Sequence, residues 1–339
     1  MLHRSGRSPR LHLRLSVYRL FPVVLVVALL SGLGPSAAET IRLAVQKTGT
    51  LAWELDVIRA HGLDQAHGVT IEVNELASPE AGKIALRGGS ADLVVSDWLW
   101  VSRERSLGAT LAFYPYSSAL GAVMAPKDAP ITALTDLKGR TLGVAGGAID
   151  KSWLLLQAAM KQRGLDLPRA ANVVYGTPAL LAQKAIQGEL DATLNYWNFC
   201  AALEAKGFRR VAGIDDVLPA LGVKGRPALV GYVFDARWAA AHAKALAGFV
   251  AAGREAQEIL AHSDAEWQRI AGLVGARDPA TLKIYRDRYR DGIPRRPIAD
   301  EAADARTLYR VLAGVGGSAL VGPAPDLDRD TFYMAISGP

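Results

Sequence analysis

The stretch Gly89-Ser90-Ala91-Asp92, followed by a short apolar run and Trp98, decides the fold because the chain repeats it. The second copy begins 99 residues later with Gly188-Glu189-Leu190-Asp191 and reaches Trp197. The strand-like segments that begin at Arg42 and Thr141 keep the same spacing. Such a repeat indicates two similar units in which strands alternate with helices.

The pattern around the repeats predicts an α/β fold of two lobes. Strands are expected at 40–46, 69–75 and 91–95, and again at 140–144, 172–175 and 190–194, with a helix after each. Such units demand parallel pairing and right-handed crossovers. We expect residues 39–120 and 235–339 to form lobe 1 and residues 121–234 to form lobe 2. Two crossing strands, within 117–124 and 228–234, are the predicted hinge, and the mostly helical last third is expected to return to lobe 1.

The N-terminal residues predict export. Five arginines precede an apolar run from Leu20 to Leu33, and Ser36-Ala37-Ala38 supplies the small residues that a signal peptidase reads. The run is shorter than the roughly 20 residues that span a bilayer. We therefore expect residues 1–38 to be a signal peptide cleaved near Ala38, and the mature protein to be periplasmic.

Charge and cysteine content limit which classes of function the chain can have. The formal charge is +6, but five arginines and no acids lie within residues 1–38, so the mature chain carries only about +1. This balance does not favour a nucleic-acid partner. Cys200 is the only cysteine, which excludes an intramolecular disulfide. No histidine lies at motif spacing from a nucleophile, and no metal-ligand cluster is visible. We expect neither catalysis nor a cofactor or metal.

The loops after the strands are the candidate binding loops, since two facing lobes place their strand ends around a shared cleft. Trp98, Tyr196 and Trp197 are predicted to wall the ligand, and packing of the lobe interface is the alternative. Asp97 and Asp150 could bind an amine or hydroxyl, although Asp150 could serve only as a helix N-cap. The charged run 285–290 is interpreted as a solvated helix face.

Four motifs carry a family resemblance. Ile41-Arg42-Leu43-Ala44-Val45-Gln46-Lys47, the segment from Leu86 to Asp92, Asp136-Leu137-Lys138-Gly139-Arg140, and the segment from Gly188 to Ala192 occur in that order. The chain thereby resembles periplasmic solute-binding proteins of ABC importers, in the subfamily for nitrate, taurine, alkanesulfonates and thiamine precursors. The resemblance implies a type II periplasmic binding protein fold, solute capture without chemistry, and an inner-membrane ABC permease as partner of a monomer.

The resemblance and the strand ends together give the predicted ligand-binding residues: Lys47, Thr48, Gly49, Thr50, Ser96, Asp97, Trp98, Ser117, Gly146, Gly147, Asp150, Asn195, Tyr196 and Trp197. Asp150 falls where sulfonate binders have Ser and Thr at a helix start. An acid there repels an anionic head group and caps the helix itself. We therefore expect an organic solute with an aromatic or apolar body and at least one hydroxyl or amine.

Two other functions remain open at this stage. One is a sensory module that presents its closed form to a membrane receptor. The other is an enzyme of the same fold, related to thiamine-pyrimidine synthases. The enzyme would need a reactive histidine in the cleft, and the predicted loops contain none. Capture of a solute for an ABC importer is the preferred interpretation.

Overall fold

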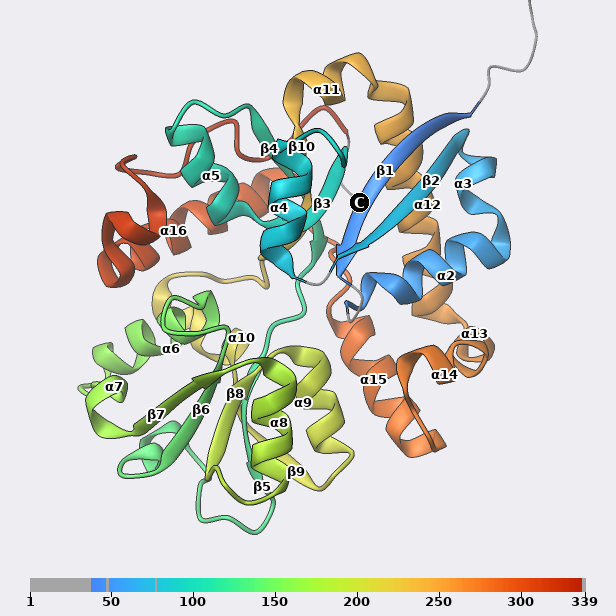
Figure 1. The fold of residues 1–339 in the computed structure, drawn as a ribbon. Coiled ribbons are helices and arrows are strands. Elements are labelled where there is room, and N and C mark those ends of the chain that lie inside the picture. The colour runs from blue at the N-terminus through green and yellow to red at the C-terminus, as the bar shows by residue number, and fades with distance from the viewer. Residues whose placement is uncertain (1–37, 47–48, 77, 337–339) are drawn as a thin grey trace, which may run out of the picture. The chain divides into compact units, whose positions relative to one another are not determined.

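The structure is a computed structural model that describes residues 38–46, 49–76 and 78–336. Residues from Glu39 onward form one compact unit. It is built around two five-stranded sheets, as the sequence predicted (Figure 1). The predicted signal peptide lies outside the described residues, except for Ala38. Within the described ranges no helix has the length and apolar character needed to cross a bilayer.

The first sheet has the strand order β2-β1-β3-β10-β4. Its strands are β1 (Glu39–Gln46), β2 (Val69–Leu76), β3 (Leu93–Asp97), β4 (Leu111–Ser117) and β10 (Val230–Asp235). Its helices are α2 (Leu51–His61), α3 (Leu63–Ala66), α4 (Pro79–Arg87) and α5 (Trp98–Ser106). β1 pairs in parallel with β2 and β3, whereas β10 runs antiparallel to β3 and β4.

The second sheet repeats this arrangement with the order β7-β6-β8-β5-β9. Its strands are β5 (Ala122–Pro126), β6 (Thr141–Ala145), β7 (Asn172–Gly176), β8 (Ala192–Asn195) and β9 (Phe208–Gly213). Its helices are η1 (Leu134–Leu137), α6 (Lys151–Gln162), α7 (Leu167–Ala170), α8 (Pro178–Ile186), α9 (Trp197–Glu204), α10 (Ile214–Val217) and η2 (Leu218–Leu221). β6 is parallel to β7 and β8, and β5 is antiparallel to β8 and β9.

The repeated aspartate has the same structural role in both lobes. Asp92 accepts a hydrogen bond from the backbone N–H of Arg42 at 2.8 Å, and Asp191 accepts one from the N–H of Thr141 at 2.7 Å. Each carboxylate thus closes the turn before its own strand and fixes the register of the neighbouring strand. The prediction that both aspartates are structural is confirmed.

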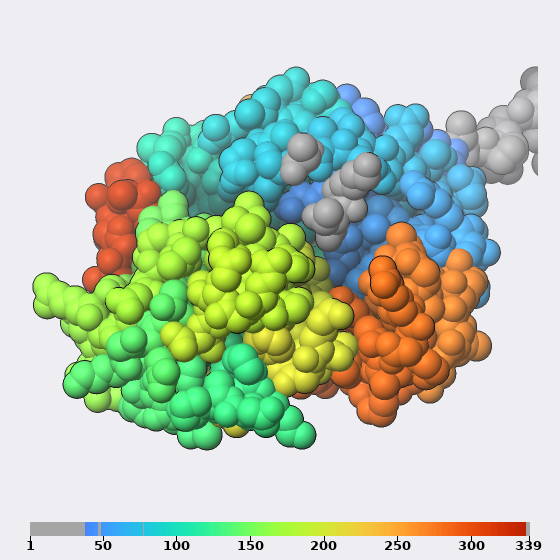
Figure 2. Space-filling model, turned by 60° about the horizontal axis from the view of Figure 1, so that its bottom comes forward, coloured from blue at the N-terminus to red at the C-terminus, as the bar shows by residue number. Residues whose placement is uncertain are grey.

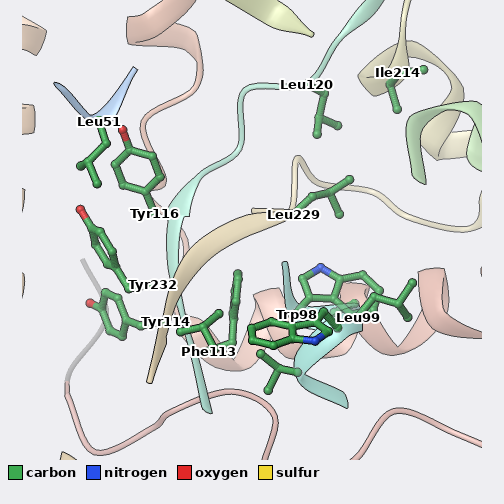
Figure 3. Packing of buried hydrophobic residues seen from close by; sticks show 14 of the residues in the cluster. Leu51, Trp98, Leu99, Phe113, Tyr114, Tyr116, Leu120, Ile214, Leu229 and Tyr232 are labelled. Carbon is green, nitrogen blue, oxygen red and sulfur yellow. The ribbon is translucent and has the colours of Figure 1, made fainter. Parts of the chain in front are cut away.

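The two connections between the sheets differ from the predicted crossing strands. β4 ends at Ser117 and β5 begins at Ala122, so residues 118–121 belong to neither sheet. The second connection, residues 222–229, is irregular as well. A segment that leaves one sheet for another loses its ladder partners on the way, so strand structure stops there. The two connections lie side by side where they meet the first sheet, because Ser117, just before the first connection, pairs with Val230, just after the second (Figure 3).

One lobe boundary needs correction. β10 pairs with β4 over its whole length and with β3 from Val230 to Val233. Residues 230–234 therefore belong to the first sheet, although the sequence grouped them with the second lobe. The apolar run Val230–Phe234 does not itself indicate which sheet it joins. Each sheet has a place for an antiparallel strand next to its parallel strands, and the run would suit either place.

The C-terminal helices contact both lobes, whereas the sequence predicted a return to the first lobe alone. They are α11 (Ala236–Ala241), α12 (Ala243–His262), α13 (Asp264–Arg269), α14 (Ala271–Val274), α15 (Pro279–Asp291) and α16 (Ile298–Val321). α12 packs on α2 and β1 of the first lobe, α15 lies against α9 of the second, and α16 touches both α5 and α6 (Figure 1). The two lobes are therefore held by these helices as well as by the two connections.

Candidate functional site

The carboxyl ends of the central parallel strands face the junction of the lobes. In the first lobe β1 leads into α2 and β3 into α5, and in the second β6 leads into α6 and β8 into α9. Strand ends in open α/β sheets are where loops and helix starts build ligand sites. In Figure 2 the green and yellow surface of the second lobe meets the blue surface of the first along a seam.

An ion pair crosses this junction. The Lys151 Nζ at the start of α6 lies 3.0 Å from Asp97 Oδ2 at the end of β3. Asp97 Oδ1 also accepts from the Trp100 N–H at 2.9 Å and so caps α5. Burial alone would raise the pKa of Asp97, but Lys151 and the Trp100 N–H together hold it below its usual value. Burial would lower the pKa of Lys151, yet Asp97 raises it. Both groups are therefore charged at neutral pH and tie one lobe to the other.

Asp150 and Tyr196 form a second polar contact on the second lobe. Asp150 Oδ1 caps α6 by accepting from the Trp153 N–H at 3.2 Å, and Asp150 also bonds the Tyr196 hydroxyl. Burial raises the pKa of both groups. Gly146 has a φ of +82°, and a Cβ there would lie 2.6 Å from the Tyr196 hydroxyl oxygen and 2.7 Å from Asp150 Oδ2. Only glycine lets the loop approach this pair so closely.

A buried acid lies deeper in the junction. Glu54, in the first turn of α2, is only 1 % exposed. It accepts from the Tyr289 hydroxyl of α15 and from Gln257 Nε2 of α12, the latter at 3.3 Å. The Tyr116 hydroxyl also bonds it. Burial raises the pKa of Glu54 to about 7, against the opposing effect of these hydrogen bonds.

Aromatic rings from both lobes surround this acid. Trp197 of the second lobe meets Trp53 of the first edge to face, with ring centroids 5.7 Å apart. Tyr289 lies 6.4 Å from Trp197 and 6.2 Å from Trp53 between ring centroids. Such edge-to-face contacts add to the stabilisation from burial. The lobes are thus joined by an aromatic contact as well as by the Asp97–Lys151 pair.

Two adjoining cavities lie at this place. The inner one, beside Glu54, has about 10 Å³ and is lined by Thr50, Glu54, Tyr116, Ser117, Ala119, Trp197, Gln257, Tyr289, Gly292 and Ile293. The outer one has about 230 Å³ and is lined by Ser118, Ala119, Leu120, Trp197, Arg210, Asp215, Asp216, Arg226, Arg288, Asp291 and Gly292. Both share Ala119, Trp197 and Gly292, so the inner cavity lies directly against the outer one.

The structure brings part of the predicted site together. Thr50, Ser117 and Trp197 line the inner cavity. Gly146, Asp150 and Tyr196 lie together in one group. Asp97 forms an ion pair with Lys151, the residue that follows Asp150. Gly49 and Gly147 lie in the loops that carry these groups, and Ser96 pairs with Gly231 inside the first sheet. Lys47 and Thr48 lie outside the described residues.

Two predicted ligand residues serve the fold instead. Trp98 is 1 % exposed and belongs to the buried core, where Figure 3 shows it beside Phe113 and Leu99. Asn195 is also 1 % exposed; its Nδ2 donates to the Pro178 carbonyl and its Oδ1 accepts from the Tyr196 N–H, each at 2.9 Å. These two hydrogen bonds link the side-chain amide of Asn195 to the backbone and so hold the β8–α9 loop in place. Neither residue lines the two cavities.

The predicted ligand-binding residues did not include the inner acid or its partners. Tyr289 belongs to the run 285–290 that was interpreted as a solvated helix face, and this is wrong for Tyr289, for Arg288 and for Tyr285, whose ring packs on Trp53. Tyr289 is 6 % exposed and bonds Glu54, 235 residues away. Arg288 donates from Nε and Nη2 to Glu204 of α9 at 2.8 to 3.2 Å. The amphipathic spacing of Tyr285 and Tyr289, four residues apart, was the available signal for a buried stripe.

The lone cysteine is buried and hydrogen-bonded. The Cys200 thiol donates to the Asn195 carbonyl at 3.2 Å, and burial raises its pKa to about 12. A thiol with such a pKa remains protonated and is a poor nucleophile. Within the described residues, no three His, Cys, Asp or Glu side chains are grouped to hold a metal ion.

Removing the ammonium of the cross-lobe pair should favour the open arrangement. Lys151→Met leaves Asp97 without its cation in the closed form, and because both side chains keep some contact with solvent the cost should be below the roughly 3–5 kcal/mol of a fully buried pair. Solute affinity should fall about tenfold, and the radius of gyration from solution scattering should increase. Lys184→Met is the matched control, because its partner Glu189 lies in the same lobe. Equal affinity in both variants would contradict a role of the pair in closure.

Comparison with solved structures gives similar folds. The periplasmic aliphatic sulphonate binding protein SsuA from Escherichia coli has a TM-score of 0.68 at 21 % identity, over 88 % of this chain and 98 % of that one. The alkanesulfonate-binding protein SsuA from Xanthomonas axonopodis pv. citri, bound to MOPS, has a TM-score of 0.66 at 18 % identity, over 88 % and 99 %. This similarity confirms the two-lobed periplasmic binding protein fold. A search of curated proteins gives no match.

The family assignment comes from the sequence profile. The profile described as NMT1/THI5 like matches residues 59–265, which is more than half of the chain. The matched segment runs from α2 through the whole second lobe to α13, and so contains Asp97, Lys151, Asp150, Tyr196 and Trp197. It agrees with the subfamily that the four sequence motifs resemble. The chain belongs to the NMT1/THI5-like family.

Proposed function

We propose that this protein captures a small organic solute between its lobes in the periplasm and delivers it to an inner-membrane ABC permease. The observation that carries the proposal is that side chains of both lobes meet in two contacts, the Asp97–Lys151 ion pair and the aromatic contact beside the two cavities. Lys151 and Trp197 come from the second lobe, and Asp97, Trp53 and Glu54 from the first or its helices. A ligand held there contacts both lobes at once, and so stabilises the closed form over the open one.

Closure is the expected mechanism. The connections 118–121 and 222–229 would act as the hinge, and the solute would contribute the free energy that shifts the population. Closed protein then presents a continuous surface of both lobes to the permease. No bond in the solute changes, and the ATP is hydrolysed by the partner ATPase. The SsuA relatives are named for sulfonates, but the acids in this site favour a solute with an amine or hydroxyl.

The test combines a ligand screen with scattering. Thermal unfolding of the mature protein, residues 39–339, is followed against libraries of amines, alcohols, sulfonates and aromatic acids. A solute at one hundred times its dissociation constant should stabilise the protein by about 2.7 kcal/mol. The same solute should reduce the radius of gyration. A compound that stabilises the protein without compaction contradicts capture by closure.

The importer role has its own test. Deleting the gene should abolish uptake of the radiolabelled solute, and a plasmid copy should restore it. Normal uptake in the deletion strain contradicts delivery to a permease, and a changed transcriptional response to the solute would then point to a sensory role. The Lys151→Met variant on the plasmid should restore uptake only at higher solute concentration.

A further inference from the structure

Glu54 is a buried acid without a cationic partner in the described part of the chain. No described lysine, arginine or histidine nitrogen lies within 4 Å of its carboxylate. Other buried acids have one: Asp97 meets Lys151 at 3.0 Å, and Asp92 meets Arg42 at 2.5 Å. A buried carboxylate that lacks a cation is costly, because hydrogen bonds replace only part of the lost hydration.

The partners of Glu54 are neutral and come from three elements. They are Tyr116 of β4, Gln257 of α12 and Tyr289 of α15, and Tyr232 of β10 also faces the acid. Burial raises the pKa of all three tyrosines, so none of them ionises near neutral pH. Burial raises the pKa of Glu54 to about 7, and the hydrogen bonds from these neutral partners only partly oppose this effect. An ammonium group beside it would supply the missing positive charge.

The space beside Glu54 suits such a group. The inner cavity of about 10 Å³ holds one water-sized group, and an ammonium is of that size. Its wall includes the hydroxyl residues Thr50 and Ser117, and the rings of Trp197 and Tyr289. Hydroxyl oxygens accept from an ammonium, and aromatic faces attract cations. The outer cavity, of about 230 Å³, takes the rest of a small molecule.

The other acids of the junction disfavour an anion. Asp97 and Asp150 occupy the N-termini of α5 and α6, where they accept from the Trp100 and Trp153 N–H groups. A sulfonate or carboxylate at either helix start would compete with the aspartate that already accepts from one of its N–H groups. Lys151 balances the charge of Asp97, so it is the charge of Asp150 that would oppose an anion.

We propose that the solute is an organic amine whose ammonium group pairs with Glu54 in the inner cavity, an inference that rests on the proposed function. Trp197 completes the wall from the second lobe, so the amine is fully enclosed only when the lobes are closed. Glu54 thereby determines specificity, because its negative charge attracts an ammonium group, interacts more weakly with a hydroxyl and repels a sulfonate.

The experiment uses matched compounds with one carbon skeleton each. Binding of 2-phenylethylamine, 2-phenylethanol and 2-phenylethanesulfonate, and of the corresponding butyl compounds, is measured by calorimetry at pH 8. For at least one skeleton the amine should bind at least tenfold more tightly than its alcohol and sulfonate. Glu54→Gln should remove this preference. Glu80→Gln, which removes an exposed acid in the first turn of α4, should keep it.

A pH titration tests the same contact in the wild-type protein, independently of how well the variant folds. As pH falls below about 7, Glu54 takes up a proton and the amine must displace it, so amine affinity should fall about tenfold per pH unit. Glu54→Gln should show no such dependence between pH 5.5 and 8.

The outcomes separate this inference from the proposed function. If an alcohol or sulfonate binds as tightly as its amine and compacts the protein, capture stands and the role of Glu54 is overturned. The role is equally overturned if Glu54→Gln keeps the amine preference, or if wild-type affinity does not change with pH. If no compound of any class binds, in these sets or in the wider screen, both proposals fail.

Discussion

Trp98→Ala should lower the free energy of unfolding by about 3–5 kcal/mol, the usual cost of truncating a buried tryptophan. Trp98 is 1 % exposed in the first-lobe core, and neighbouring side chains can refill only part of the space left. Chemical denaturation of the mature protein measures the loss. Solute affinity, measured at a temperature where the variant is folded, should change less than twofold.

Trp197→Ala is the matched control, because Trp197 occupies the equivalent position in the repeat. Both tryptophans begin the helix that follows a central strand. Trp197, however, is only partly buried and lines both cavities. Its removal should destabilise the protein by less than half as much but weaken solute binding at least tenfold. Loss of affinity in Trp98→Ala without loss of stability would show that Trp98 contacts the solute after all.

Glu54 should make the protein less stable as pH rises from about 4.5 to about 7. In the unfolded chain Glu54 loses its proton near 4.5, whereas in the folded protein its pKa is about 7. Between these values the folded state binds more protons, so the free energy of unfolding falls with increasing pH. The full effect is about 3 kcal/mol above pH 7 and disappears below pH 4.5.

Comparison with Glu54→Gln isolates this effect. Glutamine is neutral at every pH and keeps the polar contacts with Tyr289 and Gln257. The difference in unfolding free energy between variant and wild type should therefore grow from near zero at pH 4.5 to about 3 kcal/mol at pH 8. Other acids whose pKa burial raises, such as Asp150 and Glu301, affect both proteins alike. A difference independent of pH would contradict ionisation of Glu54 as the cause.

The repeated motif predicted the fold because it depends on local backbone requirements. Asp92 and Asp191 each bond an N–H of the neighbouring strand, and both strands follow a turn at a glycine with positive φ, Gly89 and Gly188. Such requirements are visible in a short stretch of sequence. The sheets, the strand order within each β-α-β set and the position of the candidate loops all follow from them.

The inner part of the candidate site could not be predicted in this way. Glu54, Gln257 and Tyr289 come from three helices, and the acid is separated from the tyrosine by 235 residues. No local pattern specifies which distant helix will cover a given loop, because that depends on how α12 and α15 pack across both lobes. Trp98 shows a second limit of prediction from the repeat. Trp98 and Trp197 hold equivalent positions but differ in burial, since only Trp197 faces the other lobe.

The contact between Gly292 and the first connection has a mechanical consequence. Gly292, just after α15, accepts from the N–H and the hydroxyl of Ser118, and a Cβ on it would lie 2.4 Å from that of Ala119. The missing side chain lets the connection lie directly on the end of α15. If the lobes rotate about the proposed hinge, Ala119 and Gly292 would lie close to the axis and move least, and Trp197 of the second lobe would move relative to them.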